Sequence, residues 1–483
     1  MTALLQSANL GAAFARAALS HPGQQAIVAE DMALVYSRLW LIVQGFALRM
    51  QAAGIDQQAI VALKSTDMIA SVAVMFATTL LGAGFVIWEE QLLADGVVRP
   101  THVLRSPEVA APGGVASILM EASWSPKHTP VPENACEHFP GAADTEAAWW
   151  YLHTSGTTGR PKYLALSQRV ALDRSLALGS DFLGAETRFT SLFPCTTRPF
   201  FVRAMAALVH GATIIDTIDP AFMQAQGVTL VCGSPRQTEA WLQGRRLSPR
   251  LMLLQLSGAR FTAAQAEVLL GSFQKVEDVY GSSETNKAFV NVKTLDDGTL
   301  VTRASPQDSS VEILRPDGAP CASGEIGEVR IRNSYMVPGY INAPEATRRA
   351  FRDGWFHPGD LACWDQQAAL CIVGRVDEII NLGGMKIDPL EVEQALRVPG
   401  VRASACFRDP RGELRLLAFV EIEASRDPEP VVRQAMAQCA QKLGPLMTPA
   451  LVYVVERIPM THDGVPMRAQ CEVMAKDLPS EAL

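Results

Sequence analysis

The sequence predicts an α/β fold in which a large N-terminal domain is followed by a small α+β domain. The chain has 483 residues, which is too long for one compact core. Short β-branched runs alternate with helix-like stretches from residue 26 onwards, as is typical of α/β proteins. The composition then changes after Asp377. We therefore predict an N-terminal domain at 1–376 and a C-terminal domain at 377–483.

The first hundred residues hold three strand candidates, at 26–28, 60–63 and 85–87. One segment here, from Met68 to Trp88, carries no charge and is long enough to span a bilayer. However, it is rich in Ala, Ser and Thr, and Gly82-Ala83-Gly84 divides it near its end. We therefore favour a buried helix from Ile69 to Leu81 and a strand from Phe85 to Trp88, with no membrane span.

The middle of the chain continues the alternation. Residues 105–146 show little periodicity and hold several Pro and Gly, so they are interpreted as a connection. Further helix and strand candidates lie at 169–178, 188–193, 205–210, 213–215, 228–231 and 252–256. The runs at 311–314, 328–332 and 369–373 indicate a later antiparallel portion.

The C-terminal segment reads as a separate unit of about a hundred residues. Its first helix is predicted at Pro389–Leu396, with a proline and acids in the first turn. Strands at 402–407, 414–422 and 451–455 and a helix at 430–443 complete an α+β pattern.

Charge and cysteine usage exclude some classes of function. The net charge of −8 and the lack of a Lys/Arg-rich run argue against a nucleic-acid partner. The nine cysteines form no Cys-x-x-Cys pair, and no His cluster has metal-ligand spacing. Because the N-terminus shows no signal-peptide pattern, we expect a cytoplasmic protein.

A loop rich in hydroxyls and glycine follows the apolar run at 147–152. It consists of Thr154, Ser155, Gly156, Thr157, Thr158, Gly159, Arg160, Pro161 and Lys162. Backbone N–H groups near glycine, hydroxyls and a lysine together suit a polyphosphate. The Walker A pattern fails, because Pro161 replaces its second glycine and Tyr163 follows the lysine. A polar turn between two strands is the simpler alternative.

The loop resembles the phosphate loop of the adenylate-forming superfamily, which includes acyl- and aryl-CoA ligases, adenylation domains and luciferases. The segment Tyr280-Gly281-Ser282-Ser283-Glu284 is similar to that superfamily's aromatic loop. The resemblance implies that Tyr280 stacks on adenine and that Glu284, with Thr154, holds Mg²⁺. By position, Thr285 would sit near the phosphate or the carboxylate. Gly258 and Ala259 would also line the nucleotide site. Without the resemblance, the segment reads as a tight turn with a solvated glutamate.

Two later segments continue the resemblance. The segment 354–360 resembles a motif whose aspartate, here Asp360, takes the ribose hydroxyls, although Pro358 replaces the usual threonine. The run 374–393 resembles the hinge of the superfamily, with Arg375 as a nucleotide ligand and Asp377 as the pivot. There, Gly383 and Gly384 would flank the pantetheine tunnel, and Lys386 would be catalytic. Segments 324–328 and 339–340 also fit the family spacing.

The resemblance covers residues 150–395 in family order and implies fold and activity together. The implied fold is a multi-subdomain N-terminal domain, with two α/β sheets and a distorted β-barrel, and a small mobile C-terminal domain. The implied activity uses ATP and Mg²⁺ to convert a carboxylic acid into an acyl-adenylate. The acyl group then passes to a phosphopantetheine thiol, on CoA or on an acyl carrier protein. A homodimer is compatible with this interpretation.

The last family motif departs from its pattern. It occupies residues 459–468 here, and Val465 stands where the family has a lysine. In the family, that lysine bridges the substrate carboxylate and the α-phosphate. Loss of such a cation typically slows a reaction by about two to three orders of magnitude. Arg468, Lys476 or Lys386 are candidates to replace it. Otherwise, the chain is an adenylation-impaired variant that mainly performs thioester transfer, or a non-catalytic binding partner in an assembly line.

The substrate region also departs from some relatives. Amino-acid-activating domains carry Phe-Asp in the region 193–201, and no aspartate appears there. We therefore expect a non-amino-acid substrate, either an aryl acid or a fatty or short acyl acid. Arg198 and Arg203 fit a second acid group on the substrate, but a surface or nucleotide role is favoured. His153 fits a general base and equally a hydrogen-bonded residue at a strand end.

Overall fold

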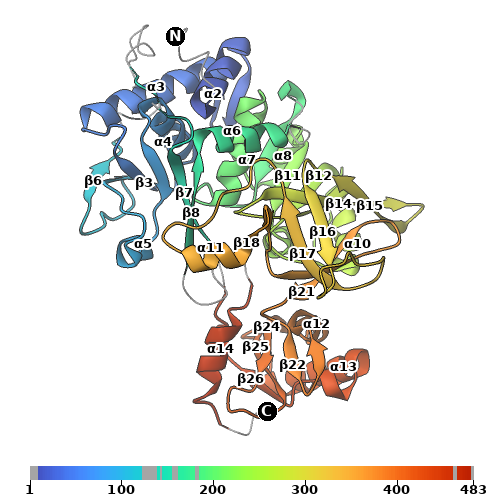
Figure 1. Ribbon diagram of the computed structural model, residues 1–483. Helices are drawn as coiled ribbons and strands as arrows, with labels where there is room; N and C mark the ends of the chain where they lie inside the picture. Colours follow the sequence, from blue (N-terminus) through green and yellow to red (C-terminus); the bar gives the residue numbers. More distant parts are fainter. Residues whose placement is uncertain are drawn as a thin grey trace. The chain divides into compact units, whose positions relative to one another are not determined.

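The computed structural model describes residues 9–121, 124, 139–141, 144–154, 161–179, 184–460 and 465–479 (Figure 1). The chain divides into two compact units, which we describe one at a time. The N-terminal unit comprises residues 1–154, 162–311 and 331–356, and the C-terminal unit comprises 155–161, 312–330 and 357–483. The domain boundary near Asp377 stays a prediction.

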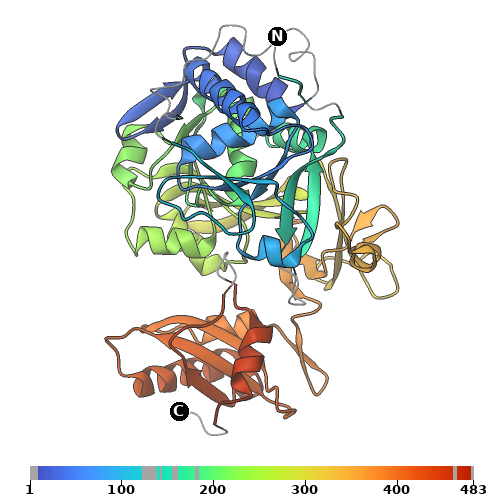
Figure 2. The same cartoon turned by 90° about the vertical axis from the view of Figure 1, so that its left-hand side faces the viewer.

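Three helices at the start of the N-terminal unit lie against one another (Figure 2). They are α2 (Leu10–Ser20), α3 (Tyr36–Ala52) and α4 (Met68–Leu81). Asp67 caps α4 by accepting a hydrogen bond from the Ala70 N–H, and Gly82 ends it in the left-handed region at φ 71°. The buried helix predicted from the uncharged segment is thus confirmed. Among the described residues, no helix has the length and hydropathy that crossing a membrane requires.

Two α/β sheets form the centre of this unit. The nine-stranded sheet has the order β15-β14-β13-β12-β11-β9-β10-β1-β2 and is parallel from β13 to β1. The six-stranded sheet has the order β6-β5-β3-β4-β7-β8 and is parallel from β6 to β7. One core that contains Phe14, Phe76, Trp150, Phe189 and Phe200 packs helices against strands of both sheets.

The bounds of these elements are as follows. The larger sheet contains β1 (Gln25–Ala29), β2 (Met32–Val35), β9 (Arg188–Ser191), β10 (Thr213–Ile215), β11 (Leu230–Gly233), β12 (Leu251–Leu256), β13 (Phe273–Ser282), β14 (Asn286–Asp296) and β15 (Thr299–Pro306). The smaller contains β3 (Ile60–Lys64), β4 (Gly84–Ile87), β5 (His102–Arg105), β6 (Ala116–Leu119), β7 (Ala148–Thr154) and β8 (Lys162–Ser167). The unit also contains a pair of short strands, β18 (Phe351–Arg352) and β19 (Trp355–Phe356). Its other helices are α5 (Gln91–Asp95), α6 (Gln168–Ala177), α7 (Arg198–Val209), α8 (Pro220–Ala225), α9 (Pro235–Leu242), α10 (Ala263–Leu270) and α11 (Pro344–Ala350).

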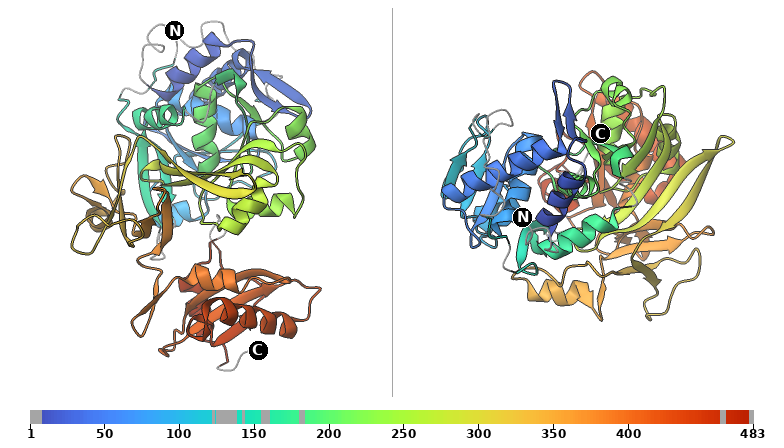
Figure 3. Two further views of the ribbon diagram at one scale, coloured as in Figure 1. Left: turned by 90° about the vertical axis from the view of Figure 1, so that its right-hand side faces the viewer. Right: turned by 90° about the horizontal axis from the view of Figure 1, so that it is seen from above.

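The structure corrects the loop expected at residues 280–284. Strand β13 continues through Tyr280 to Ser282, because it pairs with β14 as far as the turn (Figure 3). A bulge at Gly281 brings the Asn286 carbonyl so close that a Cβ there would lie 2.0 Å from its oxygen. Only a tight turn around Glu284 remains. The long β14–β15 hairpin was not predicted.

The C-terminal unit has an α+β architecture, as predicted. Strands β24 (Val401–Arg408), β25 (Leu416–Ile422) and β26 (Leu451–Val454) form one sheet. Helices α12 (Pro389–Ala395) and α13 (Pro428–Leu443) share one apolar core with this sheet, and α14 (Arg468–Ala475) shares another. The unit also contains β20 (Asp360–Trp364), β21 (Leu370–Arg375) and the hairpin of β22 (Ile380–Leu382) and β23 (Met385–Ile387). Two further strands are divided between the units, β16 (Ser310–Leu314) at its start and β17 (Gly327–Arg332) at its end.

Candidate active site

The two ends of the predicted phosphate loop are fixed by strand pairing. Thr154 ends β7, Lys162 begins β8, and the two residues are partners in the antiparallel ladder. Both are half-buried. The loop residues Ser155, Gly156, Thr157, Thr158 and Gly159 lie outside the described residues. The described ends nevertheless bring a hydroxyl and a lysine to one point of the sheet.

The other predicted nucleotide residues of the N-terminal unit lie at or directly after the carboxyl ends of strands in the parallel part of the larger sheet, the edge at which α/β sheets bind ligands. Gly258 and Ala259 come directly after β12, and Gly258 has φ 91°. Tyr280, Gly281 and Ser282 end β13. Sequence and topology therefore agree on which edge of the sheet is the candidate site.

The turn after β13 is organised by one hydroxyl. The Ser282 Oγ accepts hydrogen bonds from the backbone N–H groups of Glu284, at 3.2 Å, and Thr285, at 3.3 Å. It also lies 3.1 Å from the Thr285 Oγ1. Such a serine turn fixes the backbone locally. It thereby sets the direction in which the Glu284 side chain leaves the chain.

A buried arginine on α6 holds the same turn from the other side. The Arg174 guanidinium donates to the carbonyl oxygens of Tyr335 (3.0 Å), Ser283 (2.9 Å) and Glu284 (2.8 Å). Burial and the nearby Arg198 charge lower the pKa of Arg174 to about 9, while Glu284 opposes this shift, so the group is charged at neutral pH. Sequence analysis missed Arg174, because a single arginine in a helix gives no sign of its partners.

Glu284 is 6% exposed, and its carboxylate is held by Tyr340. The Tyr340 hydroxyl donates to the Glu284 Oε1 at 2.7 Å. The Lys162 Nζ lies 5.3 Å from the centroid of the same tyrosine ring. Tyr340 fitted the family spacing, but the sequence assigned it no role. The structure thus brings together the lysine of the phosphate loop and the predicted metal ligand.

This donor set fits a magnesium ion that is shared with a phosphate ligand. Mg²⁺ is usually bound by one or two carboxylates together with waters and substrate phosphates. In the described part of the chain, no group of three or more His, Cys, Asp or Glu side chains has the geometry of a metal site. Glu284 supplies a carboxylate and Thr154 a hydroxyl, which is the limited set that such a shared ion needs.

Three other residues singled out in the sequence have structural partners. His153 contacts the Glu89 carboxylate, which favours the hydrogen-bonded strand-end interpretation. Arg203 donates to the Pro199 carbonyl at 3.2 Å and the Ser257 Oγ at 3.3 Å. Arg198 donates to the Ser282 carbonyl at 3.0 Å, so it supports the turn that carries Glu284.

In the C-terminal unit, the predicted ribose ligand lies beside the predicted hinge. Asp360 and Arg375 are partners across β20 and β21, and their side chains form an ion pair of 3.1 Å. Arg375 also pairs with Asp377 at 2.9 Å. Burial alone would lower the pKa of Arg375, but the hydrogen bond to Asp377 and the charges of Asp360 and Glu378 raise it.

Arg468, a candidate substitute for the missing lysine, is already paired within this unit. Its guanidinium contacts the buried Glu393 at 2.9 Å and Glu378 at 3.0 Å. Val465 lies in the segment before α14, and residues 461–464 of this motif are outside the described part. Lys386 is exposed on the β22–β23 hairpin, where Gly383 and Gly384 form the turn with φ 62° and 97°.

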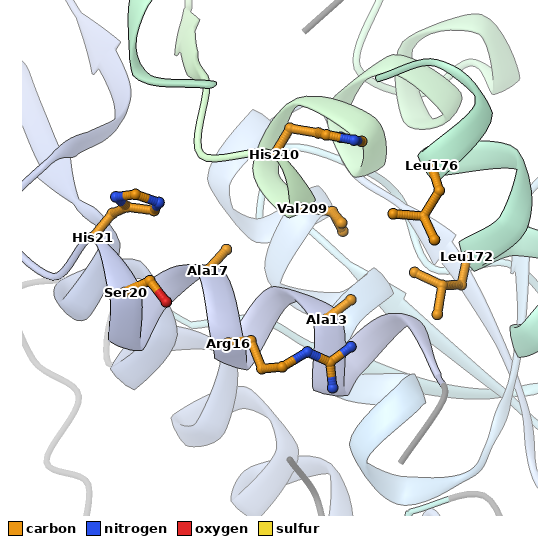
Figure 4. Close-up of a pocket in the computed structure, with 9 residues that line it drawn as sticks. All are labelled: Ala13, Arg16, Ala17, Ser20, His21, Leu172, Leu176, Val209 and His210. Carbon is orange, nitrogen blue, oxygen red and sulfur yellow. The ribbon is translucent and has the colours of Figure 1, made fainter. Parts of the chain in front are cut away.

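A separate cavity of about 300 Å³ opens between α2, α6 and α7 (Figure 4). Arg16, His21 and His210 line it together with apolar side chains that include Leu172 and Leu176. It is lined by none of the predicted site residues. Helix α6 gives Leu172 and Leu176 to this cavity and Arg174 to the Glu284 turn, so the two features lie on different faces of one helix.

Comparison with known proteins gives two family matches. The family described as "AMP-binding enzyme" matches residues 14–341, and "AMP-binding enzyme C-terminal domain" matches 391–464. A feruloyl-CoA synthase of Amycolatopsis is 28% identical over 95% of this chain and 98% of its own. A sulfoacetate–CoA ligase of Cupriavidus necator is 28% identical over 65% of this chain and 64% of its own length. A medium/long-chain-fatty-acid–[acyl-carrier-protein] ligase of Mycobacterium tuberculosis is 28% identical over 67% of this chain and 66% of its own length.

Solved structures show the same fold. The o-succinylbenzoate coenzyme A synthetase of Bacillus subtilis, in complex with AMP, aligns with a TM-score of 0.80 and 18% identity over 98% of this chain and 99% of its own. ATP-bound MatB of Rhodopseudomonas palustris aligns with a TM-score of 0.76 and 23% identity over 97% of this chain and 99% of its own. Both confirm a large N-terminal α/β domain with several sheets and a small C-terminal domain.

Proposed function

The chain belongs to the AMP-binding enzyme family of adenylate-forming ligases, and from this premise we propose that it activates a non-amino-acid carboxylic acid with ATP. A substrate carboxylate oxygen attacks the α-phosphorus of ATP, and the bond to pyrophosphate breaks. A phosphopantetheine thiol then loses its proton and attacks the acyl carbonyl, and AMP leaves. The thiol belongs to CoA or to an acyl carrier protein.

The phosphate loop would bind the polyphosphate. Lys162 would offset its negative charge, and the hydroxyl-bearing residues and glycines between Thr154 and Lys162 are the residue types that suit phosphate oxygens. Glu284 and Thr154 would hold Mg²⁺, which when bound supplies charge neutralisation for the departing pyrophosphate. Tyr280 would stack on adenine, and in the C-terminal unit Asp360 would accept the ribose hydroxyls. These roles are proposals that rest on the family motifs and on the placement described above.

One observation carries the proposal. Lys162 and Glu284 are far apart in the sequence, yet both contact Tyr340 at one edge of the sheets. A cation and a carboxylate placed together in this way suit a metal–polyphosphate ligand. The family match extends over the elements that carry all three residues.

The missing lysine favours a second candidate function. Val465 provides no cation, and Arg468 is paired with Glu378 and Glu393. A chain with these features would adenylate slowly and would mainly transfer the acyl group from a supplied adenylate, or would bind its partners without catalysis. The organised turn around Glu284 supports the full ligase over this alternative, because it keeps the metal ligand in place.

ATP–pyrophosphate exchange separates the candidates. We would compare wild type with Val465→Lys and use Glu284→Gln as a control for background exchange. The panel would contain aryl, sulfonated and fatty acids, the classes of acid in the names of the relatives. The ligase predicts exchange by wild type with one acid class and at least a tenfold increase in Val465→Lys. Exchange by Val465→Lys but not by wild type favours a chain that mainly transfers the acyl group from a supplied adenylate to the thiol. No exchange in either protein, with ATP binding intact, favours the binding partner.

A further inference from the structure

Tyr340 occupies a fixed place next to the phosphate loop. Its backbone N–H donates to the Thr347 Oγ1 of α11 at 2.9 Å, and the following residue, Ile341, donates to the Tyr163 carbonyl of β8 at 2.7 Å. Its ring packs edge-on against Phe351, with centroids 5.6 Å apart. The backbone is therefore tied to a helix on one side and a strand on the other, so the direction of the side chain is set.

Both ends of the tyrosine side chain meet a charged group. The hydroxyl donates to the Glu284 Oε1 at 2.7 Å, and the ring face lies 5.3 Å from the Lys162 Nζ. A hydrogen bond to a carboxylate restricts its rotation and leaves lone pairs for a metal. The attraction of an ammonium to an aromatic ring is weak enough for the lysine to move to a phosphate.

We propose that Tyr340 is a positioning residue that keeps Lys162 and Glu284 in place for a magnesium–nucleoside-triphosphate complex and prevents them from pairing with each other. This inference rests on the proposed function. A direct pair between lysine and glutamate would neutralise both groups before the ligand arrives, and breaking a poorly solvated pair is costly. The ring and the hydroxyl are neutral partners, so these contacts place the cation and the carboxylate without forming an ion pair between them.

Two substitutions separate the two halves of this role. Tyr340→Phe removes the hydroxyl and keeps the ring, so Glu284 loses its orienting hydrogen bond while Lys162 keeps its contact. Tyr340→Leu removes both contacts. We expect Tyr340→Phe to raise the Mg²⁺ concentration for half-maximal ATP binding about tenfold, with metal-free ATP affinity unchanged, because one charge-assisted hydrogen bond is lost. Tyr340→Leu should also change the metal-free affinity.

Tyr163→Phe is a matched control. The Tyr163 hydroxyl donates to the Asp95 Oδ2 at 2.6 Å, so this variant also removes a phenol–carboxylate hydrogen bond from the N-terminal unit. The Tyr163 ring packs in a separate apolar cluster with Val86 and Trp88. Its loss should leave the Mg²⁺ dependence of ATP binding unchanged, even where thermal stability falls.

The experiment is a calorimetric titration of ATP into each full-length variant at stepped Mg²⁺ concentrations and with a chelator, after thermal melting has shown that the variants fold. A tenfold shift in Tyr340→Phe and none in Tyr163→Phe supports the proposal. Equal shifts in both variants, or no shift in Tyr340→Phe, would overturn it, as would ATP binding by wild type that does not respond to Mg²⁺. If no acid supports pyrophosphate exchange while the Mg²⁺ shift is observed, the proposed ligase activity fails and the role of Tyr340 stands.

Discussion

The charged candidate site residues of the two units have different partners. In the N-terminal unit, Glu284 is held by a phenol and Lys162 lies over an aromatic ring. In the C-terminal unit, Arg375 and Arg468 are held by carboxylates. A cation or carboxylate whose contact is a phenol is not held in an ion pair by that contact, whereas the two arginines are held in ion pairs that fix the fold. The comparison teaches that a motif residue of the right charge is not by itself available for catalysis.

This difference bears directly on the missing lysine. Because Arg468 makes its ion pairs with Glu378 and Glu393, moving it to a substrate would leave a buried carboxylate behind. Lys386 and Lys476 are exposed, so they remain the candidates to replace the lysine.

Removing Arg174 should have the largest effect on stability. Arg174→Met leaves the carbonyls of Tyr335, Ser283 and Glu284 without their donor, and we expect a loss of about 3 kcal/mol in the free energy of unfolding. Arg169→Met, on the same helix, removes a half-exposed arginine that pairs with Asp173 at 2.6 Å and should cost less than about 1 kcal/mol. Urea unfolding of both variants measures the difference, and equal losses would refute the buried role of Arg174.

Arg468→Met should have the next largest effect, on stability alone. We expect a loss of about 2 kcal/mol, because Glu393 is left buried without its partner, and an unchanged rate of pyrophosphate exchange below the melting temperature. The matched control is Arg433→Met, which removes an exposed pair with Glu429 on α13 and should cost less than about 0.5 kcal/mol. A hundredfold loss of exchange without loss of stability would instead show that Arg468 replaces the missing lysine.

The smallest effect concerns Asp278, two residues before Tyr280. Burial raises its pKa from 3.8 to about 6, although Lys293 and Asn291 oppose the shift. Between these values the folded state binds a proton that the unfolded chain releases, so ionisation of this group lowers stability as the pH rises from about 4 to about 6. Because Asp278 is only half-buried, we expect Asp278→Asn to gain about 1 kcal/mol relative to wild type across this window, which is less than the full pKa difference corresponds to. Melting temperatures of both proteins at several pH values test this, and a constant difference would contradict it.

The sequence predicted elements whose ends carry local information. Helix α4 begins at the cap Asp67 and ends at Gly82, and α12 begins at Pro389, so their bounds follow from neighbouring residues. The family motifs in the sequence identified Lys162, Glu284 and Asp360 as candidate site residues. Strand β14 was missed, because its polar residues are stabilised by pairing with β13 and β15 and not by a local pattern.

The residues that organise the site could not be predicted from any local sequence pattern. Arg174 lies 110 positions from Glu284, and Tyr340 lies 56 positions from it. Each contact depends on how separate strands and helices pack, and no spacing in one sequence encodes that packing. Helix α7 likewise begins at Arg198, before the expected 205–210, because Pro199 stands in its first turn.

The central claim is that Lys162 and Glu284 of the N-terminal unit are directed at the magnesium–polyphosphate part of the nucleotide. The most direct test is calorimetric binding of ATP, with and without Mg²⁺, to wild type, Glu284→Gln and Arg468→Met. The account predicts that Mg²⁺ strengthens ATP binding by wild type and Arg468→Met and has little effect on Glu284→Gln. A full Mg²⁺ effect in Glu284→Gln, or its loss in Arg468→Met, would contradict the account.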